Sequence, residues 1–317
     1  MLDESIFKTA KLCVVGNINR DIKTTPITPE ASLFNDGETS IAGIEETVGG
    51  GGANSAAIAA RLGAQVSFIG QIGDDALGSR LERALQQSGV CCRLHRAPNL
   101  ATGSTVNLVF DSGHRHFLSY HPNNAALSFE ALDLSALRDA QHLLRADLWF
   151  SEAMLFGGNQ KLFQLARAAG LAVSIDLNWD PKWGHAPLAQ IEQRKQAVRA
   201  LLPFVDLAHG NVRELNEFTG ASDLNSSLSL LSDWGVRAVL VHLGKEGAGY
   251  YSNGELLTEK PSPVQRAVNT TGCGDVLSVC TILMHQVIGL PTQEKLRLAN
   301  GIVAEFMEGR RALIPEL

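Results

Sequence analysis

Seven residues, Asn269-Thr-Thr-Gly-Cys-Gly-Asp275, form the stretch of this sequence best suited to chemistry, and an apolar run over 276–284 follows at once. Glycine lets the backbone approach a ligand closely, and a helix over the apolar run would turn its unpaired N–H groups toward the same place. We therefore expect an anion site here. Asp275 could take a proton from an attacking hydroxyl while the loop amides stabilise a transferred phosphoryl group. The alternative is structural, because an acid also favours a helix N-terminus.

A second glycine-rich stretch, Thr47-Val-Gly-Gly-Gly-Gly-Ala-Asn54, leads into a helix predicted over 53–62. It lacks the Gly-Lys-Ser/Thr ending of a P-loop, and Ser55 stands where a dinucleotide fingerprint would place its third glycine. The absence of these two motifs argues against a P-loop enzyme and a dinucleotide oxidoreductase. A glycine run alone is also compatible with a flexible turn.

The third stretch, Gly16-Asn-Ile-Asn-Arg-Asp21, follows the first predicted strand. Polar groups at the carboxyl edge of a parallel sheet face its ligand crevice. Asn19 and Asp21, together with Asn54, offer donors and acceptors that suit neighbouring sugar hydroxyls. Asn and Asp after a strand also form plain turns, which is the alternative.

The elements that would position these motifs alternate between strand and helix. Such alternation implies βαβ crossovers and a mostly parallel sheet that is covered on both faces. We predict strands over 12–15, 66–69, 148–150, 172–175, 205–208 and 238–242, and helices over 53–62, 77–88, 159–169, 190–202 and from 212.

Two segments, 24–47 and 101–121, depart from this alternation. Their residues alternate as in exposed strands, with no helix between them, so we expect antiparallel strands in a small separate sheet. No long linker or repeat divides the chain. We therefore expect one domain over 1–317, with the small sheet acting as a lid.

Composition narrows the class of protein further. The chain has 317 residues, 45% of them hydrophobic and 19% charged, and a formal net charge of −6. This is an ordinary globular composition, and the negative charge makes nucleic acid an unfavourable partner. Five cysteines without a C-x-x-C pair favour a reducing cytoplasm over a disulfide framework or a zinc site. We expect neither a secretory signal nor a membrane span.

Taken together, the motifs resemble those of the ribokinase-like (PfkB family) carbohydrate kinases over nearly the full length. They occur in the order of that family, at 16–21, 49–54, 68–75 with Gly78, 211–214, 242–247 and 269–275. The resemblance implies an α/β fold, a three-layer sandwich with a mostly parallel central sheet and a small β-sheet lid. It also implies ATP and Mg²⁺ as cofactors and, in several members, a homodimer formed through the lid.

The resemblance also assigns roles to single residues. Asp275 would be the catalytic base, with Gly272, Cys273 and Gly274 as the anion hole. The acceptor sugar would be bound by Asn19, Asp21, Gly50, Asn54 and Glu152. The nucleotide would be bound by Asn211, Glu214, His242, Gly244, Gly247, Thr271 and Asn300, and Glu214 would reach the metal through water. Without the resemblance, Asn211 and Glu214 would be read as a helix capping box.

The choice of acceptor is less specified, because fold-level analogy does not supply it. Glu152 and the segment 123–127 resemble ribokinases, whereas 176–180 resembles fructokinase and 2-keto-3-deoxygluconate kinase relatives, with Asp180 where many of those carry arginine. His114, Arg115 and His116 could contact an acid or a phosphate, or could simply be solvated. We expect ATP-dependent phosphorylation of a primary hydroxyl on a small, unphosphorylated sugar. The alternatives are a nucleoside kinase of the same family and a non-catalytic binding relative.

Asn269 departs from the resemblance, since many members have aspartate there. That aspartate is expected to help bind a monovalent cation, and an asparagine offers only a neutral oxygen. The sequence therefore makes a monovalent cation doubtful.

Overall fold

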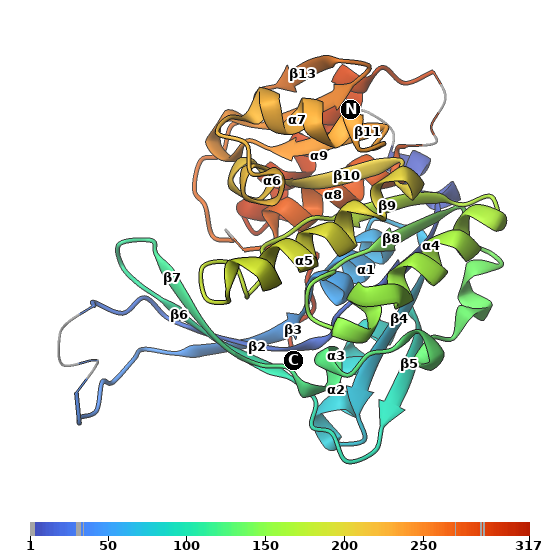
Figure 1. The fold of residues 1–317 in the computed structure, drawn as a ribbon. Coiled ribbons are helices and arrows are strands. Elements are labelled where there is room, and N and C mark those ends of the chain that lie inside the picture. The colour runs from blue at the N-terminus through green and yellow to red at the C-terminus, as the bar shows by residue number, and fades with distance from the viewer. Residues whose placement is uncertain (1–3, 30–32, 34, 270, 286, 288) are drawn as a thin grey trace.

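A nine-stranded sheet forms the centre of the computed structural model, which describes residues 4–29, 33, 35–269, 271–285, 287 and 289–317 (Figure 1). The strand order is β13-β12-β11-β10-β9-β8-β1-β4-β5. The pairs from β11 to β5 are parallel, and the pairs β11–β12 and β12–β13 are antiparallel. The strands are β1 Lys11–Val15, β4 Gln65–Gly73, β5 Cys91–Ala97, β8 His142–Arg145, β9 Ala172–Asp176, β10 Leu207–Asn211, β11 Ala238–His242, β12 Ala248–Ser252 and β13 Glu255–Glu259.

Helices cover both faces of this sheet, as the alternation predicts. Successive side chains of a strand point to opposite faces, and in β1 Val14 packs into one core while Cys13 and Val15 pack into the other. The first core includes α1 Gly51–Arg61, α2 Ala76–Gln87, α8 Cys273–Leu283 and α9 Thr292–Met307. The second includes α4 Asn159–Ala168, α5 Leu188–Arg199, α6 Val212–Thr219 and α7 Leu224–Asp233. The short helix α3 Pro122–Ala125 follows the small sheet.

The small sheet has the strand order β3-β2-β6-β7 and projects from the body of the molecule (Figure 1). Its strands are β2 Asn19–Thr24, β3 Ile44–Gly49, β6 Ser104–Val109 and β7 Arg115–Tyr120. A separate sheet was expected here, but two details differ. The pair β2 and β6 is parallel. The segment 24–47 contributes only Thr24 to β2, whereas β3 begins within it at Ile44, and its Pro- and Gly-containing part connects the two strands. Residues 30–32 and 34 lie outside the described residues.

The prediction of a strand over 148–150 is wrong, because the strand is β8, His142–Arg145. The polar ends of β8 are buried with partners: His142 Nε2 lies 2.6 Å from Ser174 Oγ, and Arg145 Nε donates to Asn159 Oδ1 at 2.8 Å. Trp149 instead lies in a turn, and its indole N–H donates to the Leu177 carbonyl at 2.7 Å. Residues 148–150 therefore follow the strand, and Leu148 and Trp149 pack into the hydrophobic core.

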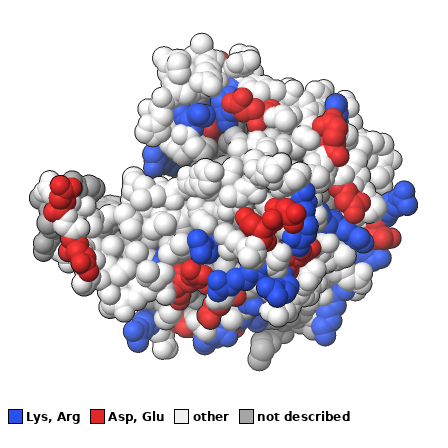
Figure 2. Space-filling model, turned by 90° about the horizontal axis from the view of Figure 1, so that it is seen from below, with Lys and Arg blue, Asp and Glu red and all other residues white. Residues whose placement is uncertain are grey.

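The surface seen in Figure 2 carries Lys and Arg interspersed with Asp and Glu, without one continuous basic area on that face. Within the described ranges, no helix is both long enough and apolar enough to cross a membrane.

Candidate active site

The loops at the carboxyl ends of β1 and β8 are tied together by Asp147. Its carboxylate accepts hydrogen bonds from the backbone N–H groups of Asn17 and Gly52, both at 2.8 Å, and of Gly51 at 3.2 Å. A Cβ on Gly52 would lie 2.6 Å from the Gly16 Cα, so this close approach of two loops requires glycine. The glycine-rich stretch therefore serves here to bring the start of α1 against the first strand.

The loop over 269–275 ends in helix α8, which starts at Cys273 after Gly272 with φ +88°. Asp275 lies in the first turn, as predicted. Burial, then the charges of Asp147, Glu214 and Asp21, raises the pKa of Asp275 to about 7. A carboxylate with such a pKa can exchange a proton near neutral pH. Thr270 lies outside the described residues.

Asp21 is a second carboxylate with a raised pKa at this edge of the sheet. Burial, together with the charge of Asp147, raises its pKa to about 6, although the Asn19 side chain donates a hydrogen bond to it at 2.7 Å. Asp21, Asp147 and Asp275 repel one another, so the site favours a ligand that brings hydrogen-bond donors or cations.

A cleft of about 1080 Å³ opens between this edge and the small sheet. It is lined by four of the five predicted sugar-binding residues, Asn19, Asp21, Gly50 and Glu152. The fifth, Asn54, lines a neighbouring pocket of about 290 Å³, which shares Asp21 with the cleft and also contains Thr271. The Glu152 side chain is largely exposed, and its Oε1 lies 3.5 Å from Arg194 Nη1.

Asp180, where relatives were expected to carry arginine, is buried in the wall of the cleft. Arg194, from α5, pairs with it at 2.7 Å and is itself buried. The two charges therefore compensate each other, and the pair contributes no net charge to the wall.

One face of the small sheet borders these two pockets. Strand residues two apart share a face, and Asp21 lies in register with Thr105 and Lys23 with Asn107. From β7, Arg115 and Ser119 reach the cleft. The face is mostly polar, with Phe117 between Arg115 and Ser119 on β7, which indicates that it borders a ligand site rather than a core.

A third pocket, of about 540 Å³, lies on the other side of the same loop. It contains four of the predicted nucleotide-binding residues, with Cys273 and Gly274 of the loop: His242, Gly244, Gly247 and Asn300. A Cβ on Gly274 would lie 3.1 Å from His242 Nδ1, so the loop packs directly on that ring. The structure therefore brings these four residues together beside the loop.

Three predicted nucleotide-binding residues do not line that pocket. Thr271 lines the pocket of about 290 Å³ with Asn54, and its Oγ1 accepts a hydrogen bond from Arg115. Asn211 and Glu214 form the reciprocal capping box of α6: Asn211 Oδ1 accepts from the Glu214 N–H at 2.9 Å, and Glu214 Oε2 accepts from the Asn211 N–H at 2.8 Å. The helix capping box, which is the alternative interpretation of this pair, is therefore present in the structure. Burial also raises the pKa of Glu214, and the charge of Glu214 in turn helps to raise the pKa of Asp275.

Sequence reasoning missed two features, Asp147 and a buried chain of polar groups that joins α8 to β10 and β11. In the chain, Ser278 Oγ lies 2.9 Å from His209 Nδ1 and 2.8 Å from His242 Nε2. Burial lowers the pKa of His242 to about 4, so both its ring and the chain are neutral at physiological pH. A signal for Asp147 was available, because an acid two residues after a strand at this edge is well placed for function.

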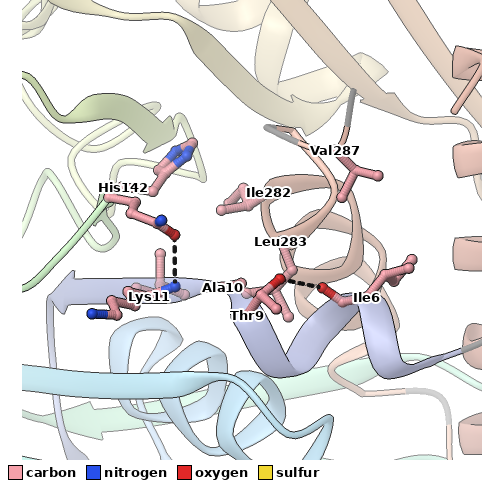
Figure 3. A pocket seen from close by; sticks show the side chains of 10 residues that line it. Ile6, Thr9, Ala10, Lys11, His142, Ile282, Leu283 and Val287 are labelled. Carbon is pink, nitrogen blue, oxygen red and sulfur yellow. Dashed lines mark hydrogen bonds between the residues drawn. The ribbon is translucent and has the colours of Figure 1, made fainter. Parts of the chain in front are cut away.

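A cavity of about 320 Å³ lies at the opposite, amino ends of β1 and β8 (Figure 3). Lys11, His142 and several apolar side chains line it. Burial and the neighbouring His285 lower the pKa of His142 to about 3. The cavity contains none of the predicted site residues and is separate from the cleft.

Comparison with known proteins decides the family. The model of the pfkB family carbohydrate kinases matches residues 9–302. The chain belongs to this family. It is accordingly a carbohydrate kinase, a phosphotransferase, with curated relatives that are named fructokinase and ribokinase.

Two curated relatives illustrate the distance within the PfkB family. The chain is 27% identical to probable fructokinase-4 of Arabidopsis thaliana over 290 residues, 87% of this chain and 86% of the relative. It is 29% identical to the ribokinase of Haemophilus influenzae over 279 residues, 84% of this chain and 82% of the relative.

Solved structures agree on the ribokinase-like fold. An E. coli protein assigned provisionally as a ribokinase II, in complex with ATP and Mg²⁺, superposes with a TM-score of 0.80 at 25% identity, covering 96% of this chain and 94% of that one. Ribokinase of Arabidopsis thaliana with ribose and ATP gives a TM-score of 0.74 at 24% identity, covering 97% and 96%. The three-layer fold with its small sheet is thereby confirmed.

Proposed function

We propose that this PfkB kinase transfers the γ-phosphoryl group of ATP to a primary hydroxyl of a small, unphosphorylated sugar that resembles ribose or fructose. One observation carries the proposal: a single loop separates the two candidate binding pockets. Thr271 lines the pocket on the acceptor side, and Cys273 and Gly274 line the pocket on the nucleotide side. Asp275, with its raised pKa, directly follows.

The nucleotide pocket fits ATP in its composition and its backbone. It combines apolar walls, including Val303 and Met307, with a few polar groups, among them His242 and Asn300, as ligand sites do. A Cβ on Gly247, at φ +98°, would lie 2.2 Å from the Glu259 carbonyl oxygen, so the turn from His242 to Gly247 can form only with glycine there. Gly244, Gly247, His242 and Asn300 would hold the nucleotide.

The Mg²⁺ ion would neutralise charge on the phosphates of bound ATP. Among the described residues, no three or more His, Cys, Asp or Glu side chains are grouped as a metal cage. Mg²⁺ commonly keeps several waters and takes only one or two carboxylates beside the phosphates. We assign Glu214 as that carboxylate, acting through water, and Asn211 as its neighbour toward the phosphates.

On the acceptor side, residues of this chain would orient the sugar, and one carboxylate would accept a proton from it. Asn19, Asp21, Gly50, Asn54 and Glu152 would hold the hydroxyls. Asp275, ionised, would accept the proton of the attacking hydroxyl on a carboxylate oxygen. The N–H groups at the start of α8, after Gly272, would stabilise the charge on the transferred group.

We further propose that the small sheet closes over the acceptor as a lid. Its β7 strand is exposed along its whole length, and Leu118 and Tyr120 on it are 54% and 66% exposed. Hydrogen exchange with and without the acceptor should show protection over β6 and β7, and equal exchange would count against closure. The same exposed strand supports a homodimer through the lid, for which sedimentation is the test.

We place the protein in a reducing cytoplasm, because its five cysteines, all within the described residues, form no disulfide. A fractionation experiment would test this placement.

A nucleoside kinase remains a second candidate, because Phe117, Phe150 and Trp179 line the cleft and could stack on a base. An ADP-release screen over pentoses, hexoses, keto-acids and nucleosides, with ATP and Mg²⁺, separates the candidates. We expect release with a pentose or hexose. Release with nucleosides alone would favour the second candidate, and no release with any acceptor would favour a non-catalytic binding protein.

A further inference from the structure

Asn107 on β6 has a side-chain oxygen without a hydrogen-bond partner. The residue is only 5% exposed, and within the described part of the chain no donor reaches its Oδ1. Buried polar atoms in folded proteins are nearly always paired, because an unpaired one forfeits its interaction with water. The partner of Asn107 is therefore expected to be a ligand or an ordered water.

A second buried oxygen without a partner lines the same pocket. Asn54, on α1, is 8% exposed, and its Oδ1 also accepts no hydrogen bond in the described residues. Both asparagines line the 290 Å³ pocket that contains Asp21 and Thr271. Two side-chain amide oxygens without partners among the described residues, one on α1 and one on β6, thus line the same pocket as Thr271 of the loop before α8.

The charges around this pocket indicate what its occupant brings. Lys23, beside Asn107 in register, pairs with Glu45 at 3.5 Å. Arg311 pairs with Glu305 at 2.5 Å. Because these two cations are already compensated and Asp21 is an acceptor, the pocket suits neutral hydroxyl groups better than a carboxylate or a phosphate.

We infer that Asn107 determines acceptor specificity by accepting a hydrogen bond from a sugar hydroxyl other than the one phosphorylated. The inference rests on the proposed function and adds the small sheet to the residues that read the sugar. A site that hydrogen-bonds a hydroxyl discriminates strongly against an analogue without it, because the buried group is then left unpaired. Asn107 would therefore distinguish sugars that differ at one carbon.

Calorimetric binding without nucleotide tests this assignment. D-ribose and D-fructose, each with its singly deoxygenated analogues, are titrated into the unmodified protein, Asn107→Leu and the control Asn225→Leu, whose asparagine is exposed on α7. The unmodified protein and the control should bind one deoxy analogue at least tenfold more weakly than its parent sugar. Asn107→Leu should bind the two equally, with the parent weakened about tenfold.

Two outcomes overturn the assignment: unchanged affinity of Asn107→Leu for the parent sugar, or full retention of discrimination against every deoxy analogue, which would mean that water alone pairs with Asn107. Asn107→Ala gives the same comparison if the leucine variant fails to fold. ADP release keeps the two proposals apart. Unchanged discrimination with normal ADP release removes only the role of Asn107, whereas lost discrimination without ADP release removes only the proposed transfer.

Discussion

Arg115, on strand β7 of the small sheet, donates a hydrogen bond to Thr271 Oγ1 at 2.5 Å. The contact joins residues 156 positions apart and links the small sheet to the loop that precedes α8. The Arg115 charge also opposes the burial that raises the pKa of Cys273 to about 11. The guanidinium therefore acts electrostatically on the loop where we place phosphoryl transfer.

Removing this charge should slow transfer. Arg115→Gln takes a cation away from the developing negative charge, and one lost donor of this kind costs about a hundred- to a thousandfold in kcat. Steady-state kinetics should show that loss with the KM for ATP nearly unchanged. The exposed Arg138→Gln is the matched control. A kcat within twofold of the unmodified enzyme would refute the role of Arg115.

The pH dependence should report Asp275. Its folded-state pKa is about 7, so the carboxylate is protonated below that pH and ionised above it. If the ionised form accepts the proton, kcat/KM should rise with pH and level off above about pH 7. Because the charge of Asp147 helps to raise this pKa, Asp147→Asn should move the rise to lower pH. A profile that is flat from pH 5 to 8 would contradict the assignment.

Asp147→Asn should also destabilise the fold. The substitution removes a charged acceptor from three backbone N–H groups, and we expect a loss of about 2 kcal/mol in the free energy of unfolding. Urea denaturation at pH 8 measures this. An unchanged denaturation midpoint would mean that water replaces these bonds.

Asp275→Asn should stabilise the protein in a pH-dependent way. Since the folded-state pKa, about 7, lies above the ordinary aspartate pKa of 3.8, ionisation of Asp275 disfavours the folded state by up to about 4 kcal/mol above pH 7. The gain from the variant should therefore be largest at pH 8 and vanish as pH falls toward 4. Equal melting-temperature shifts at both pH values would contradict the raised pKa.

Potassium should activate this enzyme weakly or not at all. The Asn269 side chain donates to the Phe306 carbonyl at 3.0 Å, a bond that aspartate could not donate. Asn269→Asp should therefore cost about 1 kcal/mol of stability and increase the dependence on potassium, because a bound cation would compensate the new charge. Assays at fixed ionic strength test both forms. Strong saturable activation of the unmodified enzyme would show this reasoning to be wrong.

The loop motifs could be predicted because the residues that determine each of them are close together in the sequence. Glycines, a carboxylate and an apolar run within fifteen residues fix a loop and a helix start, so α8 and its Asp275 lie where the spacing indicated. The capping box of Asn211 and Glu214 was equally legible.

Other features depend on contacts between distant segments. Strand β8 was misplaced because its polar ends, His142 and Arg145, are buried with partners that the local sequence does not reveal. Asp147 was missed with it. Asn107 gave no signal at all, since its unpaired oxygen becomes evident only when β6 pairs with β2 in the folded chain.

The most direct test of the central claim is the turnover of Asp275→Asn with the acceptor found in the screen. Turnover should fall 10²- to 10⁴-fold, as expected for the loss of a general base. The dissociation constants of the sugar and of ATP should stay within a few-fold, because the carboxylate is needed for the hydroxyl proton and not to hold either ligand. Retention of more than about a tenth of the turnover would contradict the account.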